Sequence, residues 1–213
     1  MRLAGAIFDL DGTLADTLPA CFAAFRAACA KLGGPAYTDA QIRGLFGPSE
    51  EGMVQRAMPA CWEEALAVLL EEYQRHLALC PRLFPSVASA LARLRERRIP
   101  LALVTGKGPK TTTMSLAHFG LDRTFDLVET GSPLGVVKAA AIARIVVAWG
   151  MTPPEVIYVG DAVADMHAAA EAGVLAVAAA WAPSAIAAEL AAASPHRLFT
   201  DAGEFETWLL GSV

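Results

Sequence analysis

The sequence predicts an α/β protein in which a parallel sheet carries a helical insertion directly after its first strand. Through residues 81–213, short apolar segments alternate with helical ones, which is typical of a parallel sheet with right-handed crossovers. One further apolar segment, from Leu3 to Phe8, lies near the N-terminus, and residues 15–80 after it have helical spacing throughout. We therefore predict a core formed by residues 1–14 and 81–213 and a helical domain formed by residues 15–80, which would emerge over the end of the first strand as a lid.

The helical insertion contains start and stop signals for four helices. Gly33 and Gly34 end the first helix, and Thr38 with Gln41 has the spacing of a capping box that starts the second. Ser49 is a candidate N-cap for the third helix. The expected helices cover residues 16–32, Thr38 to about Gly47, Ser49 to Pro59, and about Trp62 to Leu79.

The rest of the core contains signals for four strands and four longer helices. Pro109 suits the first turn of a helix, and Gly120, Gly150 and Gly173 each lie just past the end of one. An alanine-rich stretch over residues 178–193 is expected to form one surface helix. The expected strands cover residues 101–104, 125–128, 156–159 and 174–178, and the helices cover residues 87–98 with Ser86 as cap, 109–119, 138–149 and 162–172.

Composition and charge exclude several other classes of protein. Of 213 residues, 55% are apolar and 18% are charged, which is typical of a folded chain and not of a disordered one. The net charge is -5 and no basic block stands out, so we expect no nucleic acid partner. Asp9 and Asp11 interrupt the N-terminal apolar run, and no later run is long enough to span a bilayer, so neither an export signal nor a membrane partner is expected.

The four cysteines indicate a reducing compartment. They form no C-x-x-C pair and lie in apolar, helical-looking sequence, so small buried thiols are favoured over a disulfide framework or a metal site. We expect a soluble, cytoplasmic protein, and the sequence leaves a monomer and a homodimer equally open. The cysteines are Cys21, Cys29, Cys61 and Cys80.

Two aspartates directly follow the N-terminal strand. Asp9 and Asp11 are two residues apart, so in extended chain they point the same way, at the edge of the sheet where open α/β proteins bind ligands. Two like charges held together need a shared proton or a cation, and oxygen ligands of this kind suit Mg²⁺. An Asx turn formed with Gly12 is the alternative interpretation.

Later strands are followed by further polar residues that a parallel sheet would bring to the same edge. Thr105, with Gly106 behind it, suits donation to a phosphate, although capping of the next helix is the alternative. Lys138 lies at a helix N-terminus, where the macrodipole opposes a cation, so a bound anion would explain it better than helix stability does. A solvated surface lysine is the alternative there, and Lys107 and Lys110 are expected to be solvated.

Asp161 and Asp165 follow the strand at residues 156–159. They are four apart and therefore lie on one face of the turn and helix that begin there. Asp161 would be the natural partner of Asp9 in a metal site, with Asp165 orienting its neighbours. Helix capping by Asp161, with Asp165 as a favourable acid in the first turn, is the alternative.

The order of these motifs resembles the haloacid dehalogenase (HAD) superfamily over essentially the whole chain. Residues 9–13 match its D-x-D-x-T motif, and Thr105, Lys138 and residues 160–165 stand where its three later motifs would fall. The resemblance implies the HAD fold, a Rossmann-like parallel sheet with an inserted α-helical cap, similar to the phosphoglycolate phosphatase-like members. The chain departs from the family pattern at Gly106, where Asn is common, and at Ala139, where Pro is usual.

The resemblance also implies a set of roles. Asp9 would attack phosphorus and form an aspartyl-phosphate, and Asp11 would serve in turn as general acid and general base. Mg²⁺ would be held by the Asp9 carboxylate, the Asp11 backbone carbonyl and Asp161. The expected catalytic residues are Asp9, Asp11, Thr105 and Lys138; Gly12, Thr13 and Gly106 join them as substrate-binding residues; the metal-binding set is Asp9, Asp11, Asp161 and Asp165.

We therefore expect a Mg²⁺-dependent phosphatase that hydrolyses a small phosphorylated metabolite. A sugar phosphomutase retains the same core residues and stays open, as does a non-catalytic binding or regulatory module on this fold. A dehalogenase of the family is disfavoured by Asp11 and Asp161, and a phosphonatase of the family by Asp11. Arg43, Phe46 and Ser49, around Gly47-Pro48, are candidates for choosing the substrate, but we favour a routine surface turn for them.

Overall fold

The computed structural model describes residues 3–213. Within them the strands form one parallel sheet in the order β3-β2-β1-β4-β5-β6, with β1 paired to β2 on one side and to β4 on the other. This confirms the predicted α/β class. The strands are β1 (Gly5–Phe8), β2 (Leu101–Val104), β3 (Leu127–Glu129), β4 (Val156–Gly160), β5 (Leu175–Ala179) and β6 (Arg197–Phe199).

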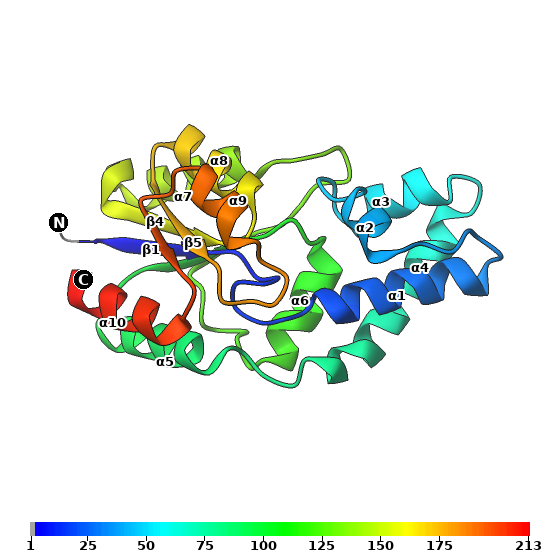
Figure 1. Ribbon diagram of the computed structural model, residues 1–213, viewed down its shortest axis with the longest axis horizontal. Helices are drawn as coiled ribbons and strands as arrows, with labels where there is room; N and C mark the ends of the chain where they lie inside the picture. Colours follow the sequence, from blue (N-terminus) through cyan, green and yellow to red (C-terminus); the bar gives the residue numbers. More distant parts are fainter. Residues whose placement is uncertain (1–2) are drawn as a thin grey trace.

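Helices cover both faces of the sheet (Figure 1). Because neighbouring strand residues point to opposite faces, Phe8 joins the hydrophobic cluster beneath α5 and α10, whereas Ile7 joins the cluster beneath α7 and α8. Such double coverage is why these strands are apolar without alternation. The core helices are α5 (Pro85–Glu96), α6 (Pro109–His118), α7 (Lys138–Trp149), α8 (Val163–Ala172), α9 (Ala187–Ala192) and α10 (Ala202–Ser212), with a 3-10 turn, η2, at Pro153–Glu155.

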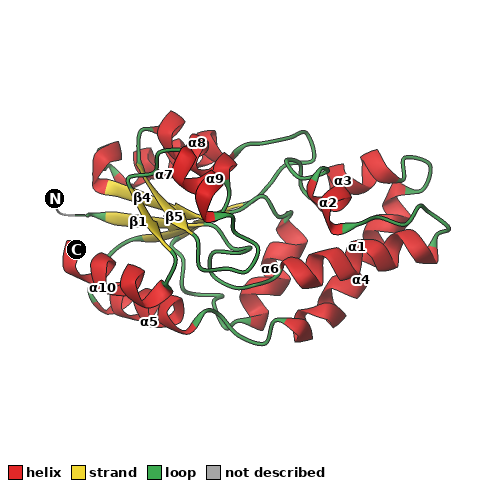
Figure 2. Cartoon of the chain, viewed as in Figure 1, coloured by secondary structure: helices red, strands yellow, loops and turns green. Residues whose placement is uncertain are grey.

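The chain between β1 and α5 forms a separate helical group. Figure 2 shows this group at the end of the molecule opposite the two chain termini, beyond the sheet. It has its own hydrophobic cluster, which includes Phe25 of the first helix and Leu69 and Tyr73 of the fourth. Thr38 forms the predicted capping box with Gln41. The helices are α1 (Leu18–Lys31), α2 (Asp39–Arg43), α3 (Glu50–Ala57) and α4 (Trp62–His76), followed by the 3-10 turn η1 (Leu77–Leu79).

Several predicted elements differ in detail. The strand expected from Phe125 begins only at Leu127, because the Asp126 carboxylate accepts a hydrogen bond from the Leu101 backbone N–H at 2.9 Å. Helix α5 begins at Pro85, so Ser86 is not its N-cap. The alanine-rich stretch holds one helix, α9, as expected, while its first residue, Ala178, pairs with Gly160 in the sheet.

The structure also describes the cysteines and the length of the helices. In residues 3–213, the four cysteines are free; Cys29 and Cys80 are buried, and Cys21 and Cys61 are partly exposed. Over the same residues, none of the helices combines the length and the apolar character that crossing a membrane requires.

Candidate active site

The carboxyl end of β1 holds an ion pair between the buried Asp9 and the partly buried Lys138. The Asp9 backbone N–H donates to the carbonyl of Val159 at 2.9 Å, which continues the pairing of β1 with β4 and fixes the aspartate at the edge of the sheet. Lys138, the first residue of α7, places its Nζ 2.7 Å from Asp9 Oδ2 and 2.6 Å from Asp165 Oδ1. Residues that are 129 positions apart in the chain are therefore in direct contact.

Asp165 uses both carboxylate oxygens to hold this arrangement. Oδ1 accepts from Lys138 and from the Tyr158 hydroxyl at 3.0 Å, and Oδ2 accepts from the Ala162 backbone N–H at 3.1 Å. The capping alternative for Asp161 is wrong, because Ala162 is the N-cap of α8 and Asp165 supplies the carboxylate that binds its N–H. Asp165 is thus buried and fully engaged in orienting Lys138 and the start of α8.

Three carboxylates meet at this point and carry more negative charge than Lys138 balances. Asp9, Asp161 and Asp165 each offer an oxygen, and these atoms lie within 4.8 Å of one another. Burial raises the pKa of Asp161 well above its usual range, with repulsion from Asp165 and Asp9 adding to the effect. Burial likewise raises the pKa of Asp9 to about 6, although Lys138 opposes the shift. A hard cation with oxygen preference, such as Mg²⁺, fits this donor set.

The loop after β1 is shaped to fit against Asp161. Gly12 has φ +72°, and a Cβ at this position would lie 2.1 Å from Asp161 Oδ2, so only glycine fits. The Thr13 hydroxyl donates to Asp161 Oδ1 at 3.4 Å, and Trp181 Nε1 donates to the Thr13 carbonyl at 3.1 Å. Within the part of the chain that the structure describes, Gly12 and Thr13 are both buried. They contact Asp161 and position it, and neither is among the described residues that line the cavity discussed below.

Thr105 and Gly106 follow β2 at the same edge of the sheet. Thr105 is buried, its backbone N–H donates to the Glu129 carbonyl at 3.1 Å, and its hydroxyl oxygen accepts from the Lys107 N–H at 3.3 Å. It does not cap α6, whose N-cap is Gly108. At Gly106 a Cβ would come no closer to a side chain than 3.9 Å, at Lys138 Cε, so this glycine leaves space beside the lysine.

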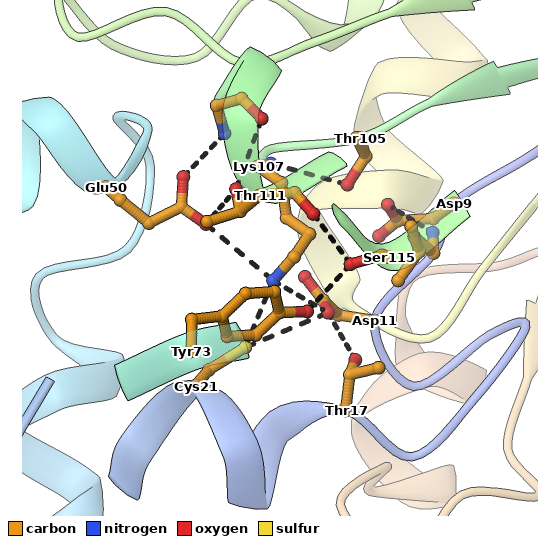
Figure 3. Close-up of polar contacts among 12 residues, drawn as sticks. Asp9, Asp11, Thr17, Cys21, Glu50, Tyr73, Thr105, Lys107, Thr111 and Ser115 are labelled. Atoms are coloured by element: carbon orange, nitrogen blue, oxygen red, sulfur yellow. Dashed lines mark hydrogen bonds and ion pairs between the residues drawn. The ribbon is translucent and has the colours of Figure 1, made fainter. Parts of the chain in front are cut away.

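The expectation that Lys107 is solvated is wrong. Only 4% of this residue is exposed, whereas Lys110 is exposed as expected. The Nζ of Lys107 lies 3.2 Å from Asp11 Oδ1, 3.7 Å from Glu50 Oε1 and 4.3 Å from the centre of the Tyr73 ring (Figure 3). Asp11 belongs to the core and Glu50 to the helical group, so Lys107 lies between the two parts of the chain.

Glu50 also binds the start of α6 directly. Its Oε2 accepts from the Gly108 backbone N–H at 2.5 Å, and its Oε1 accepts from the Thr111 hydroxyl at 2.8 Å (Figure 3). A carboxylate at a helix N-terminus is stabilised by the positive end of the helix dipole.

The acids around Lys107 keep it protonated. Burial by itself lowers the pKa of Lys107, but Asp11 and the neighbouring acids raise it, and the net pKa lies well above its usual range.

A cavity of about 230 Å³ lies between these residues and the helical group. Arg43 and Phe46 are exposed residues that also line this cavity, so their side chains face it, and a role in choosing the substrate stays a prediction. Ser49 lies elsewhere: it is buried, and its backbone N–H donates to the Ser132 carbonyl at 2.9 Å. The predicted site residues that line the cavity are Asp9, Asp11, Thr105, Gly106, Lys138, Asp161 and Asp165.

The fold and this site define a haloacid dehalogenase-like protein: a parallel sheet with two aspartates after β1, a lysine at the start of α7 and an acidic pair after β4. The model of the haloacid dehalogenase-like hydrolase family matches residues 6–179, and the chain belongs to this family.

Curated relatives and solved structures agree with this family. The chain is 35% identical over 178 residues to a phosphoglycolate phosphatase of Synechococcus elongatus, a match that covers 82% of each protein. It is 30% identical to a phosphoglycolate phosphatase of Chromobacterium violaceum, covering 80% of this chain and 82% of that protein. A haloacid dehalogenase-like hydrolase from Streptococcus pneumoniae has a similar structure, with a TM-score of 0.78, 26% identity, and coverage of 97% and 98%.

Proposed function

We propose that this protein is a Mg²⁺-dependent phosphatase that hydrolyses a small phosphomonoester through an aspartyl-phosphate on Asp9. The observation that carries the proposal is the position of Asp9, whose carboxylate lies 2.7 Å from Lys138 and beside two more carboxylates, the buried Asp165 and the partly buried Asp161. A nucleophile held next to a cation and a metal-ligating cluster is what transfer of an anionic phosphoryl group requires. The relatives that are named as phosphatases support the same reaction class.

The first chemical step would be attack by Asp9. A carboxylate oxygen of Asp9 forms a bond to phosphorus while the bond from phosphorus to the alcohol oxygen breaks, and Asp11 gives its proton to that leaving oxygen. In the second step Asp11 takes a proton from water, the water oxygen attacks phosphorus, and the bond to Asp9 breaks to release phosphate. Asp11 is suited to this role because its side chain faces the same cavity from the next turn of the loop.

The remaining residues would bind charge. Mg²⁺ held by Asp9, the Asp11 backbone carbonyl and Asp161 would supply the positive charge that lets two anions approach each other. Lys138 and the Thr105 hydroxyl would bind the phosphoryl oxygens, and Asp165 would keep Lys138 in place through its 2.6 Å contact. Helices α1–α4 would act as a cap that covers the substrate, because they form the other wall of the cavity.

The test is release of phosphate from p-nitrophenyl phosphate with and without Mg²⁺. We expect activity that depends on Mg²⁺ and is lost in Asp9→Asn, a change that keeps the size of the side chain. Asp39→Asn, which alters an exposed carboxylate on α2, is the matched control and should behave as the unmodified protein. Full activity in Asp9→Asn would contradict the proposal, and transfer of phosphate within a sugar phosphate only in the presence of a bisphosphate primer would support the mutase instead.

A further inference from the structure

The part of the cavity that faces the helical group is apolar. Six apolar side chains from all four helices of the group form most of its wall, and each is buried to 7% exposure or less; Cys21, Arg43 and Glu50 of the same helices complete it. A substrate bound through its phosphate at Lys138 would direct its organic part at this wall. The six apolar side chains are Leu18, Phe25, Ile42, Met53, Leu69 and Tyr73.

The rim of the cavity is apolar as well. Phe46, in the loop between α2 and α3, is 42% exposed, and Val136, in the loop before α7, is 68% exposed. The two loops lie close together, because a Cβ at Gly47 would be 3.6 Å from Val136 Cγ2. Large apolar side chains left exposed at the rim of a pocket are a mark of a binding site for an apolar group.

The charges around the cavity disfavour a second anion on the substrate. Of the two lysines, Lys138 is paired with two carboxylates of the core, and Lys107 with Asp11 and Glu50. Arg43 lies over the Phe22 ring, 5.2 Å from its centre. The described residues of the lining carry five carboxylates against three cations, and these are Asp9, Asp11, Glu50, Asp161 and Asp165 against Arg43, Lys107 and Lys138.

A carboxylate on the substrate would therefore enter a cavity in which Glu50 and Asp11 already neutralise Lys107. Among the described cations of the lining, Arg43 has no carboxylate partner, and it is exposed and lies over the Phe22 ring. Burial of a carboxylate deeper in the cavity, away from Arg43, is costly, whereas an uncharged organic group gains from contact with the apolar wall. The cavity also has room for such a group. Because an apolar cavity of about 150 Å³ admits benzene, 230 Å³ has room for a phosphoryl group and an organic part of about that size.

We propose that the preferred substrates are phosphomonoesters of small, uncharged, apolar alcohols, either aromatic or branched aliphatic, and not acidic ones such as 2-phosphoglycolate. This specificity rests on the proposed phosphatase function. It differs from the acidic substrate in the name of a relative, phosphoglycolate phosphatase. The residues that would select the substrate are those of the wall contributed by α1–α4 and of the rim formed by Phe46 and Val136.

Two substrate pairs test the proposal in the presence of Mg²⁺. Benzyl phosphate and 4-carboxybenzyl phosphate have nearly the same leaving group and differ in one remote carboxylate; isobutyl phosphate and 2-phosphoglycolate form the smaller pair. We expect kcat/KM to be at least about tenfold higher for the uncharged member of each pair. An acidic substrate that equals or exceeds its uncharged partner in either pair overturns the proposal while the phosphatase function stands. Absence of hydrolysis for every phosphomonoester refutes the phosphatase function itself.

A variant at the rim tests the location of the binding site. Phe46→Ala should raise KM for benzyl phosphate by about threefold or more and leave methyl phosphate unaffected, because methyl phosphate has no group that reaches the rim. Phe46 is partly exposed, so the change should not prevent folding. Leu134→Ala, a change of an almost fully exposed leucine in the same loop as Val136, is the matched control. An unchanged KM for benzyl phosphate in Phe46→Ala would contradict the assignment.

Discussion

Two lysines at the carboxyl edge of the sheet, Lys107, which is buried, and Lys138, which is partly buried, have similar surroundings but partners in different parts of the chain. Each Nζ lies near two carboxylates: Lys138 contacts Asp9 and Asp165, and Lys107 contacts Asp11 and Glu50. All partners of Lys138 belong to the core, whereas Glu50 reaches Lys107 from α3 of the helical group. Lys138 thus completes the site from within the core, and Lys107 links one of its aspartates to the helices that cover it.

The two lysines do not differ in charge. Burial by itself lowers the pKa of each, but the neighbouring carboxylates raise both well above the usual range, so both stay protonated at neutral pH. They differ in which part of the chain supplies the negative charge. We therefore expect changes at Lys138 to affect chemistry and changes at Lys107 to affect Asp11 and the position of the helices.

The largest effect is expected from Lys138→Met. The change keeps much of the side-chain volume but removes the cation that contacts Asp9 at 2.7 Å, so the proposed transition state loses a charge partner. We expect kcat for p-nitrophenyl phosphate to fall by about 10²–10³-fold. Lys110→Met, at an exposed lysine of α6, is the control. A loss of less than about threefold in Lys138→Met would show that the lysine is merely structural.

A smaller effect, of about tenfold in kcat/KM, is expected from Lys107→Met. Asp11 would lose its cation, but the contacts of Lys138 with Asp9 and Asp165 would remain. Because Glu50 would also lose a partner, amide hydrogen exchange in α3 should accelerate, while exchange in β1 and β4 should not change. Equal acceleration in the sheet and in α3 would indicate general destabilisation and would remove the distinction between the two lysines.

The smallest effect is expected from Glu50→Gln. The amide oxygen can still accept a hydrogen bond from Gly108 or Thr111, but the charge that faces Lys107 is gone. We expect kcat/KM to change by about two- to threefold, and the preference of benzyl phosphate over 4-carboxybenzyl phosphate to decrease, because an anion would no longer meet Glu50. A larger loss than that of Lys107→Met would reverse the order predicted here.

Much of the candidate site could be predicted from the sequence. Asp9, Thr105 and Asp161 each follow a buried strand, so the parallel topology alone places them at one edge of the sheet. The prediction for Lys138 required one further argument: the helix dipole disfavours a cation at a helix N-terminus, so a lysine there indicates an anion nearby.

Lys107 could not be predicted in this way. It lies two residues after Thr105, in a segment whose pattern is that of a solvated turn, and its burial depends on Cys21, Glu50 and Tyr73 of three different helices. Contacts between the core and an insertion arise from packing that periodicity does not encode.

The C-terminal β6 and α10 were not predicted either. In β6 only Leu198 and Phe199 are apolar and Arg197 is exposed, so the segment lacks the continuous apolar run that marks the central strands.

The Asp11→Asn variant, assayed with p-nitrophenyl phosphate and Mg²⁺, separates the proposed covalent role of Asp9 from the proposed proton transfer by Asp11. Nitrophenolate leaves without protonation, so the first step should proceed, but the second should stall because no base activates water. We predict a burst of about one nitrophenolate per protein and a phosphoryl group that peptide mapping locates on Asp9. Sustained turnover at the unmodified rate, or a phosphoryl group on another residue, would contradict the account.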